Sequence, residues 1–132
     1  MFGLFGSKCE RMSMQDARIE LDKHADVLLL DVRTPEEYRQ GHIPGSINLP
    51  LDRLQSGLSN VLPDKQARVF VYCLSGSRSQ SACSYMSRVG YEQVTNIGGI
   101  MSWRGPVVTG SEQGHRNTGP DHTEGYRAAS DF

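Results

Sequence analysis

A cysteine follows directly on an apolar run in the middle of this sequence. Residues 68–72, Arg-Val-Phe-Val-Tyr, have the pattern of a buried strand, and Cys73 continues it without a breaking residue. A helical pattern begins a few residues later, so loop amides and the helix dipole can converge on the sulfur. Because the thiolate is the nucleophilic form of cysteine, this arrangement predicts a reactive Cys73 rather than a buried structural thiol.

The loop after Cys73 has the composition that a tight anion-binding turn requires. Gly76 permits a left-handed backbone angle or close approach of the chain, and the small Ser75 and Ser77 keep the mouth open. Arg78 is a permanent cation with two possible uses. It can contact an anionic sulfur donor, or it can pair with a buried carboxylate that braces the loop. The sequence leaves both open, with bracing slightly preferred.

The remaining polar candidates have structural interpretations. Asp31 ends an apolar run, where we expect it to accept hydrogen bonds from neighbouring loops rather than to act as a general base. His42 is expected to hold its turn by hydrogen bonds. Cys83 is expected to pack in the core, although a resolving role stays an alternative, and Cys9 lies in the N-terminal arm without a visible partner.

The cysteine and histidine positions also bear on compartment and metals. Three cysteines form no paired framework, which favours a reducing compartment, with the cytoplasm as the default location. The four histidines have no ligand spacing with cysteines or carboxylates, so we expect no metal. Nucleophilic chemistry by a thiolate requires no organic cofactor, and none is expected.

Strand and helix patterns alternate along the chain. Helices are expected near residues 14–23, from a cap at Thr34 to Gly41, at 51–58, and from about Ser77 to a stop at Gly90; strands are expected at 27–30, 46–49, 68–72 and 94–97. This alternation predicts an α/β fold with a mainly parallel sheet and helices on both faces. Ligands bind beyond the carboxyl ends of such strands, which is where Cys73 falls.

Length and charge restrict the class of protein. The 132 residues fit one domain, and fourteen basic against fifteen acidic side chains give a net charge of −1, so no general attraction for nucleic acid or acidic membranes is expected. No apolar run is long enough to span a membrane. We expect a flexible arm at residues 1–10, a domain at 11–108 and a polar, disordered tail at 109–132.

Three motifs resemble those of one family. Residues 31–38, Asp-Val-Arg-Thr-Pro-Glu-Glu-Tyr, together with 41–50, Gly-His-Ile-Pro-Gly-Ser-Ile-Asn-Leu-Pro, resemble the first signature of rhodanese domains. Residues 72–79 resemble the rhodanese active-site loop, and 98–103, Gly-Gly-Ile-Met-Ser-Trp, resemble the closing motif. The motifs occur in the family's order between Met12 and Val108. The resemblance implies the doubly wound rhodanese fold, with a five-stranded, mainly parallel sheet.

The resemblance also implies an activity and its residues. Cys73 matches the position that carries a persulfide, in a sulfurtransferase that moves sulfane sulfur from a donor such as thiosulfate to cyanide, a thiol or a protein thiol. Asp31 and Arg33 match positions that support the site. The cradling amides map onto the loop residues Leu74, Ser75, Gly76, Ser77, Arg78 and Ser79. Leu74 departs from the polar or basic residue common there, and a persulfide carried on a thiol or protein is an alternative donor.

Two other functions compete with sulfur transfer. Cysteine-dependent phosphatases related to this fold also use a loop cysteine and an arginine, but they place five residues between the two. Cys73 and Arg78 enclose four, and Tyr72 stands where the phosphatases usually have histidine. A non-catalytic interaction module of the rhodanese type is the second alternative, because fold alone does not determine function. Such modules usually lack the cysteine that is present here.

Overall fold

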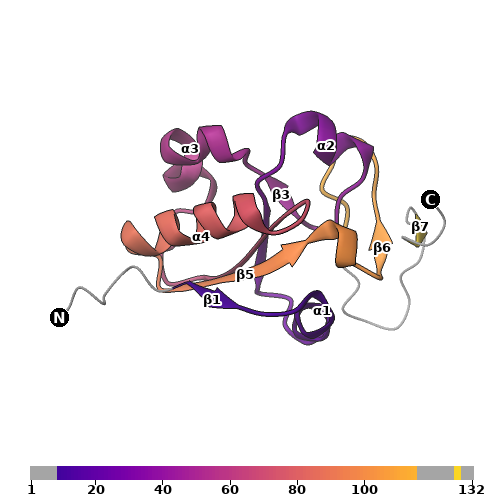
Figure 1. Ribbon diagram of the computed structural model, residues 1–132, viewed down its shortest axis with the longest axis horizontal. Helices are drawn as coiled ribbons and strands as arrows, with labels where there is room; N and C mark the ends of the chain where they lie inside the picture. Colours follow the sequence, from indigo (N-terminus) through magenta and orange to yellow (C-terminus); the bar gives the residue numbers. More distant parts are fainter. Residues whose placement is uncertain (1–8, 116–126, 129–132) are drawn as a thin grey trace.

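The chain folds around a five-stranded main sheet with helices on both faces, and it has a second, two-stranded sheet (Figure 1). The computed structural model describes residues 9–115 and 127–128. In chain order the elements are β1 (Glu10–Arg11), α1 (Met14–Lys23), β2 (Leu28–Asp31), α2 (Pro35–Gln40), β3 (Ile47–Asn48), the 3-10 helix η2 (Leu51–Arg53), α3 (Leu54–Val61), β4 (Arg68–Cys73), α4 (Ser77–Arg88), β5 (Gln93–Gly99), the 3-10 helix η3 (Ile100–Ser102), β6 (Pro106–Val107) and β7 (Arg127–Ala128).

The main sheet has the strand order β1-β5-β4-β2-β3, and every neighbouring pair is parallel. The central strand β4 pairs with β2 on one side and with β5 on the other, so its carboxyl end, at Cys73, lies between two neighbouring strand ends. The prediction of a five-stranded, mainly parallel α/β sheet is confirmed. Its edge strand β1 had no counterpart among the strands expected from sequence.

Helices cover both faces of the sheet, as predicted (Figure 1). Side chains alternate along β4: Val69, Val71 and Cys73 pack with α3 and α4 on one face, while Phe70 and Tyr72 pack with α1 on the other. All five are essentially unexposed. Because both faces of β4 are buried, the strand reads in sequence as a continuous apolar run instead of an alternating one.

Local signals account for the helix ends. The Ser13 side chain accepts from the amide of Asp16 at the start of α1, and Thr34 and Glu37 form the reciprocal capping box expected for α2. Gly90, with φ 106°, follows the end of α4 as predicted. The capping contacts join residues three apart, which is why the pattern of the sequence was sufficient to find them.

Cys83 packs in the core as expected, but the expectation that the cysteines form no pair was wrong. The two cysteines form a disulfide with a Cα–Cα distance of 5.6 Å, which ties the start of β1 to the inner face of α4. Cys73 is the free cysteine of the described chain. Residues 9 and 10, assigned to a flexible arm, are therefore held by a covalent bond and by the pairing of β1 with β5. Residues 1–8 of the predicted arm lie outside the described residues.

The predicted disordered tail is also corrected at its start. The amide of Gly110 donates to the Arg39 carbonyl at 2.8 Å, and the carbonyl of Gln113 accepts from Gly45 at 2.7 Å. The segment after residue 108 is thus bonded to the domain, and β7 further on pairs antiparallel with β6. The rest of the tail, residues 116–126 and 129–132, lies outside the described residues. The exact domain boundaries stay a prediction.

Within the part of the chain that the structure describes, no helix combines the length and the apolar character that crossing a membrane requires.

Candidate functional site

The sulfur of Cys73 lies in a cradle of main-chain amides. The amide of Gly76 donates to Sγ at 3.0 Å and that of Ser79 at 3.3 Å, and the Ser79 hydroxyl oxygen lies 3.4 Å from Sγ. Gly76 has φ 116°, a left-handed angle that turns the chain back over the sulfur before α4 begins. The loop predicted from sequence therefore encloses the sulfur, and the amides of Gly76 and Ser79 are among the six that were expected to hold it.

The cradle changes the acidity of the thiol. Burial of Cys73 works to raise its pKa, because the charged form loses hydration. Hydrogen bonds from the Ser79 hydroxyl and from the amides of Ser79, Gly76 and Ser75 outweigh that effect, and the pKa lies below its ordinary value. The loop thus favours the thiolate, which is the nucleophilic form of cysteine.

The end of β5 packs against the backbone of the loop at Leu74. A Cβ at Gly99 would overlap the Leu74 carbonyl group, so only glycine allows the two chains to lie this close. The amide of Met101 donates to the same carbonyl at 3.3 Å. The buried Asn96 side chain accepts from Ser79 Oγ at 2.7 Å and donates to the Gly76 carbonyl at 3.3 Å. Sequence reasoning missed Asn96, since an asparagine inside a strand carries no local signal of its partners.

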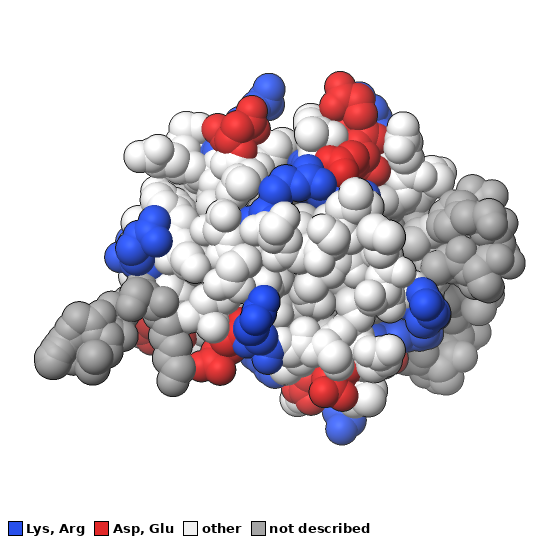
Figure 2. All heavy atoms as spheres, in the orientation of Figure 1, with Lys and Arg blue, Asp and Glu red and all other residues white. Residues whose placement is uncertain are grey.

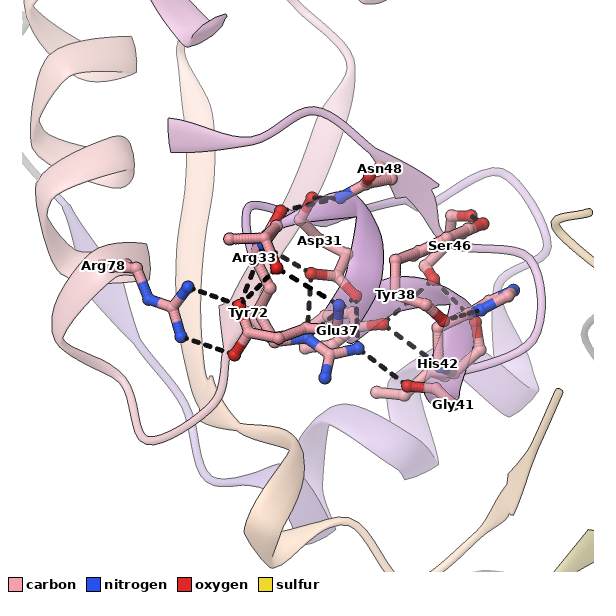
Figure 3. A network of polar contacts seen from close by, with 12 residues as sticks. Asp31, Arg33, Glu37, Tyr38, Gly41, His42, Ser46, Asn48, Tyr72 and Arg78 are labelled. Carbon is pink, nitrogen blue, oxygen red and sulfur yellow. Dashed lines mark hydrogen bonds and ion pairs between the residues drawn. The ribbon is translucent and has the colours of Figure 1, made fainter. Parts of the chain in front are cut away.

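Arg78 forms a bidentate ion pair with Glu37. Its Nη1 and Nη2 donate to the two carboxylate oxygens at 2.7 and 3.0 Å, joining α4 to α2 (Figure 3). The hydrogen bond from Arg78 lowers the pKa of Glu37 to about 2, against a smaller opposing effect of burial and with help from Thr34. Of the two possibilities left open for Arg78, this geometry is that of the brace, with a partly exposed carboxylate as its partner.

Asp31 and Arg33 form a second, buried pair at the carboxyl end of β2. The guanidinium donates to the Asp31 carboxylate through Nε at 3.1 Å and Nη2 at 2.7 Å, and Nη2 also donates to the Gly41 carbonyl at 2.8 Å (Figure 3). The amide of Arg33 donates to the same carboxylate. Asp31 therefore accepts hydrogen bonds, as expected, and joins the ends of β2 and α2.

His42 holds the loop between α2 and β3. Its Nδ1 and Nε2 lie 2.8 and 2.7 Å from the carbonyl oxygens of Tyr38 and Glu112, and its ring stacks on that of Tyr38. The hydroxyl of Tyr72 accepts from the amide of Ile43 and contacts Ser46 in the same network (Figure 3). The predicted hydrogen-bonding part of His42 is confirmed.

Two hollows flank the loop. A polar one of about 840 Å³ is lined by Ser75, Gly76 and Asn96 together with residues around β1, and a more apolar one of about 500 Å³ is lined by Leu74, Met101 and Trp103 with polar neighbours. Leu74 and Met101 are 40% and 67% exposed, whereas Cys73 is 1% exposed. Because Cys73 is buried, a reagent can reach its sulfur only if it is small or if its reacting sulfur extends past the exposed residues around the loop.

Charged side chains are scattered over the face of the molecule that Figure 2 shows. On the face in Figure 2, blue and red side chains surround a broad uncharged area without a large patch of one sign, consistent with the net charge of −1. Among residues 9–115 and 127–128, no three His, Cys, Asp or Glu side chains gather as metal ligands would. The hydrogen bonds that lower the pKa of Cys73 come from residues of the loop itself.

Comparison with protein-family models gives a match to the Rhodanese-like domain over residues 13–105. The chain belongs to the rhodanese family. Its rhodanese domain thus includes the amide cradle, the Asp31–Arg33 pair and the closing segment around Trp103.

Similar proteins agree with this assignment. The rhodanese chain is 44% identical over 79 residues to a "Sulfurtransferase" of Allochromatium vinosum (59% of this chain, 72% of the relative) and 41% identical over 81 residues to "Thiosulfate sulfurtransferase PspE" of Escherichia coli (61% and 78%). A solved structure described as "rhodanese with anions from E. coli" is 39% identical, with a TM-score of 0.60, covering 64% of this chain and 99% of that one. The prediction of a rhodanese-type sulfurtransferase is confirmed.

Proposed function

We propose that this chain transfers sulfane sulfur from thiosulfate, or from a related donor, to a thiophilic acceptor through a persulfide on Cys73. The observation that carries the proposal is the pair of amides donating to Sγ at 3.0 and 3.3 Å. Such amides stabilise negative charge on a thiolate and on the outer sulfur of a persulfide alike. Similarity to a thiosulfate sulfurtransferase of Escherichia coli supports thiosulfate as the donor.

The proposed cycle has two displacements. The Cys73 thiolate attacks the outer sulfur of thiosulfate, forming the Sγ–S bond while the S–S bond of the donor breaks and its electron pair leaves with sulfite. The enzyme then holds a persulfide anion. A cyanide ion or thiolate attacks the outer sulfur, the Sγ–S bond breaks, and its electron pair returns to Sγ. The products are thiocyanate or an organic persulfide, and the kinetics are of the double-displacement type.

The supporting residues have separate duties in this proposal. Arg78 holds the loop through Glu37 and contributes a cation near the entrance, while Asp31 and Arg33 maintain the ends of β2 and α2. Leu74 and Met101 give the entrance an apolar side. That side supports, as a second donor class, a persulfide carried on an organic thiol or on a protein. Cyanide, a thiol and a protein thiol are the acceptors that the chemistry admits.

The rival functions gain no support from the geometry. A phosphatase requires its arginine free to bind phosphate, whereas both guanidinium nitrogens of Arg78 that face Glu37 are engaged in the ion pair. A non-catalytic module does not require a thiol held by amides with its pKa lowered. Sulfur transfer uses both features.

Intact mass measurement tests the proposal. Protein treated with thiosulfate is expected to gain one sulfur, about 32 Da, which cyanide removes, and Cys73→Ser is expected to gain none. Cys9 and Cys83 cannot account for the gain while their disulfide is intact, so the double variant Cys9→Ser/Cys83→Ser, which keeps Cys73 alone, is the matched control and should still be loaded. A stable gain of phosphate from a phosphoryl substrate, or turnover by Cys73→Ser, would refute the proposal.

The state of the cysteines bears on the compartment in which the protein resides. Unpaired cysteines were the ground for a cytoplasmic location, and the Cys9–Cys83 disulfide removes that ground, because disulfides persist mainly in oxidising compartments. We therefore propose that the native protein carries the disulfide in an oxidising compartment. Acid-quenched protein from its native host should show one free thiol, Cys73; three free thiols would support the cytoplasm instead.

A further inference from the structure

The Ser79 hydroxyl has one proton and several acceptors around it. Its Oγ lies 2.7 Å from Asn96 Oδ1, 3.0 Å from the Gly76 carbonyl, 3.4 Å from the Gly98 carbonyl and 3.4 Å from Cys73 Sγ. A hydroxyl donates one hydrogen bond at a time. Ser79 is unexposed, so bulk water does not form hydrogen bonds with its hydroxyl. The direction of this one hydrogen bond must therefore depend on which neighbour attracts the proton most strongly.

Two of these acceptors are weak competitors. The Gly76 carbonyl already accepts from the amide of Gln80 at 3.1 Å and from Asn96 Nδ2 at 3.3 Å, which occupies both of its lone pairs. The Gly98 carbonyl lies 3.4 Å from Ser79 Oγ, which is too far for a strong hydrogen bond between two oxygens. The effective competitors are Asn96 Oδ1, which is the nearest, and Sγ of Cys73, whose charge changes during catalysis.

The orientation of the Asn96 amide is set by backbone groups that cannot exchange roles. Its Oδ1 faces the amide of Gly98, a donor, at 2.9 Å, and its Nδ2 faces the carbonyl of Gly76, an acceptor. Nδ2 also donates to Gln80 Oε1 at 3.0 Å. Rotating the amide would point Nδ2 at the Gly98 amide, donor against donor, and Oδ1 at the Gly76 carbonyl, acceptor against acceptor. Oδ1 is therefore held toward Ser79, and its hydrogen bond from Gly98 remains when Ser79 turns away.

We propose that Asn96 Oδ1 and Cys73 Sγ compete for the hydroxyl proton of Ser79. Asn96 is a positioning residue that accepts this hydrogen bond while Sγ is uncharged. When Sγ is a thiolate, Sγ accepts it instead. In the thiol, Sγ–H donates to Ser79 Oγ and Ser79 donates to Asn96. In the thiolate, the hydroxyl turns to the charged sulfur, because a hydrogen bond to an ion is stronger than one to a neutral amide.

The same turn accompanies sulfur transfer, and this part rests on the proposed function. When the thiolate attacks a donor, Sγ becomes a neutral sulfide and the charge moves to the outer sulfur. Ser79 then returns to Asn96 Oδ1, leaving the outer sulfur to the loop amides. When an acceptor removes that sulfur, the charge comes back to Sγ and Ser79 turns again. Neither rotation of the hydroxyl transfers a proton from one heavy atom to another.

The test measures the pKa of Cys73 from the pH dependence of iodoacetamide alkylation on cyanide-treated protein. Asn96→Leu removes the competing acceptor, so the pKa is expected to fall by about half a unit to one unit. Ser79→Ala removes the donor, so the pKa is expected to rise by about one unit. In the Ser79→Ala background, Asn96→Leu is expected to have no further effect, because the two residues act through one hydroxyl.

A merely structural role predicts the opposite sign. If Asn96 only kept the loop folded, Asn96→Leu would loosen the cradle and raise the pKa in both backgrounds. Gln80→Met is the matched control: it removes a partner of Nδ2, leaves Oδ1 in place and should leave the pKa unchanged. Asn96→Ala is measured beside Asn96→Leu, and a rise in either folded variant overturns the proposal.

Ser79→Ala keeps the proposal open to refutation if both Asn96 variants misfold. An unchanged pKa in Ser79→Ala would show that the hydroxyl does not serve Sγ. Alkylation needs no sulfur transfer, so the outcome is independent of whether Cys73 forms a persulfide. Failure of the proposed function would instead appear as absent thiosulfate loading in the wild-type chain.

Discussion

The ion pair between Arg78 and Glu37 leads to a quantitative prediction about the loop. A pKa of about 2 for Glu37, against an ordinary value of 4.5, corresponds to an upper limit of about 3 kcal/mol for the folded-state interaction. The two side chains are 33% and 26% exposed, so solvent screening reduces this to about 1–2 kcal/mol. Replacing either partner should therefore destabilise the protein by roughly that amount.

The sign of the pH dependence follows from the direction of the shift. Because folding lowers the pKa of Glu37, the stabilisation is fully present above the ordinary value of 4.5 and is lost as the pH falls through about 2. Glu37→Gln should flatten this part of the stability profile. The loss at acid pH should be smaller in that variant than in the wild type.

A double-mutant cycle measures the pair. Urea denaturation of Arg78→Gln, Glu37→Gln and the double variant is expected to give a coupling of about 1–2 kcal/mol, with the double variant little worse than either single one. Arg39 and Glu36, on the same α2 but 3.9 Å apart and mostly exposed, provide the control pair, with coupling near zero.

Kinetics with thiosulfate decide whether Arg78 also binds the donor. If bracing is its main duty, Arg78→Gln and Glu37→Gln lower kcat/KM together, because both release the loop. If Arg78 mainly binds the anion, Arg78→Gln raises KM while Glu37→Gln leaves KM unchanged or lowers it by freeing the guanidinium. The second result would refute the bracing argument.

Three further predictions concern the loop and its supports. Alkylation of Cys73 should remain fast below pH 8.5, the region of an ordinary thiol pKa, because the folded cradle lowers that pKa; urea-unfolded protein should return to the ordinary value. Cys9→Ser should lower the free energy of unfolding by about 4 kcal/mol, since the Cys9–Cys83 bond closes a separation of 74 residues, and reductant should destabilise the wild type but not the variant. Gly99→Ala should lower the melting temperature and the transfer rate together, because the new Cβ would overlap the Leu74 carbonyl; an unaltered rate would show that this close approach is unnecessary.

The disulfide illustrates what a pattern of residues conceals. Cys9 precedes a two-residue strand, and Cys83 lies on a helix face that reads as ordinary core. Their pairing depends on β1 lying beside β5, on the sheet edge that α4 covers. No spacing in the sequence indicates that arrangement, so the two cysteines were interpreted as independent, and the disulfide removes that ground for expecting a reducing compartment.

By itself, the sequence determined the features that depend on near neighbours. The apolar run ending at Cys73, the tight turn at Gly76 and the capping box of α2 follow from periodicity and steric rules that act over a few residues. These were enough to single out Cys73 as the candidate nucleophile and to predict the class of fold.

Tertiary structure decided the contacts that join distant segments. The Glu37–Arg78 pair spans 41 residues and the contact between Ser79 and Asn96 spans 17, and each exists only because particular strands are neighbours in the sheet. Strand order is set by the packing of the whole domain, which local propensity does not encode. The partners of the loop, and therefore the control of its sulfur, could be identified only from the folded chain.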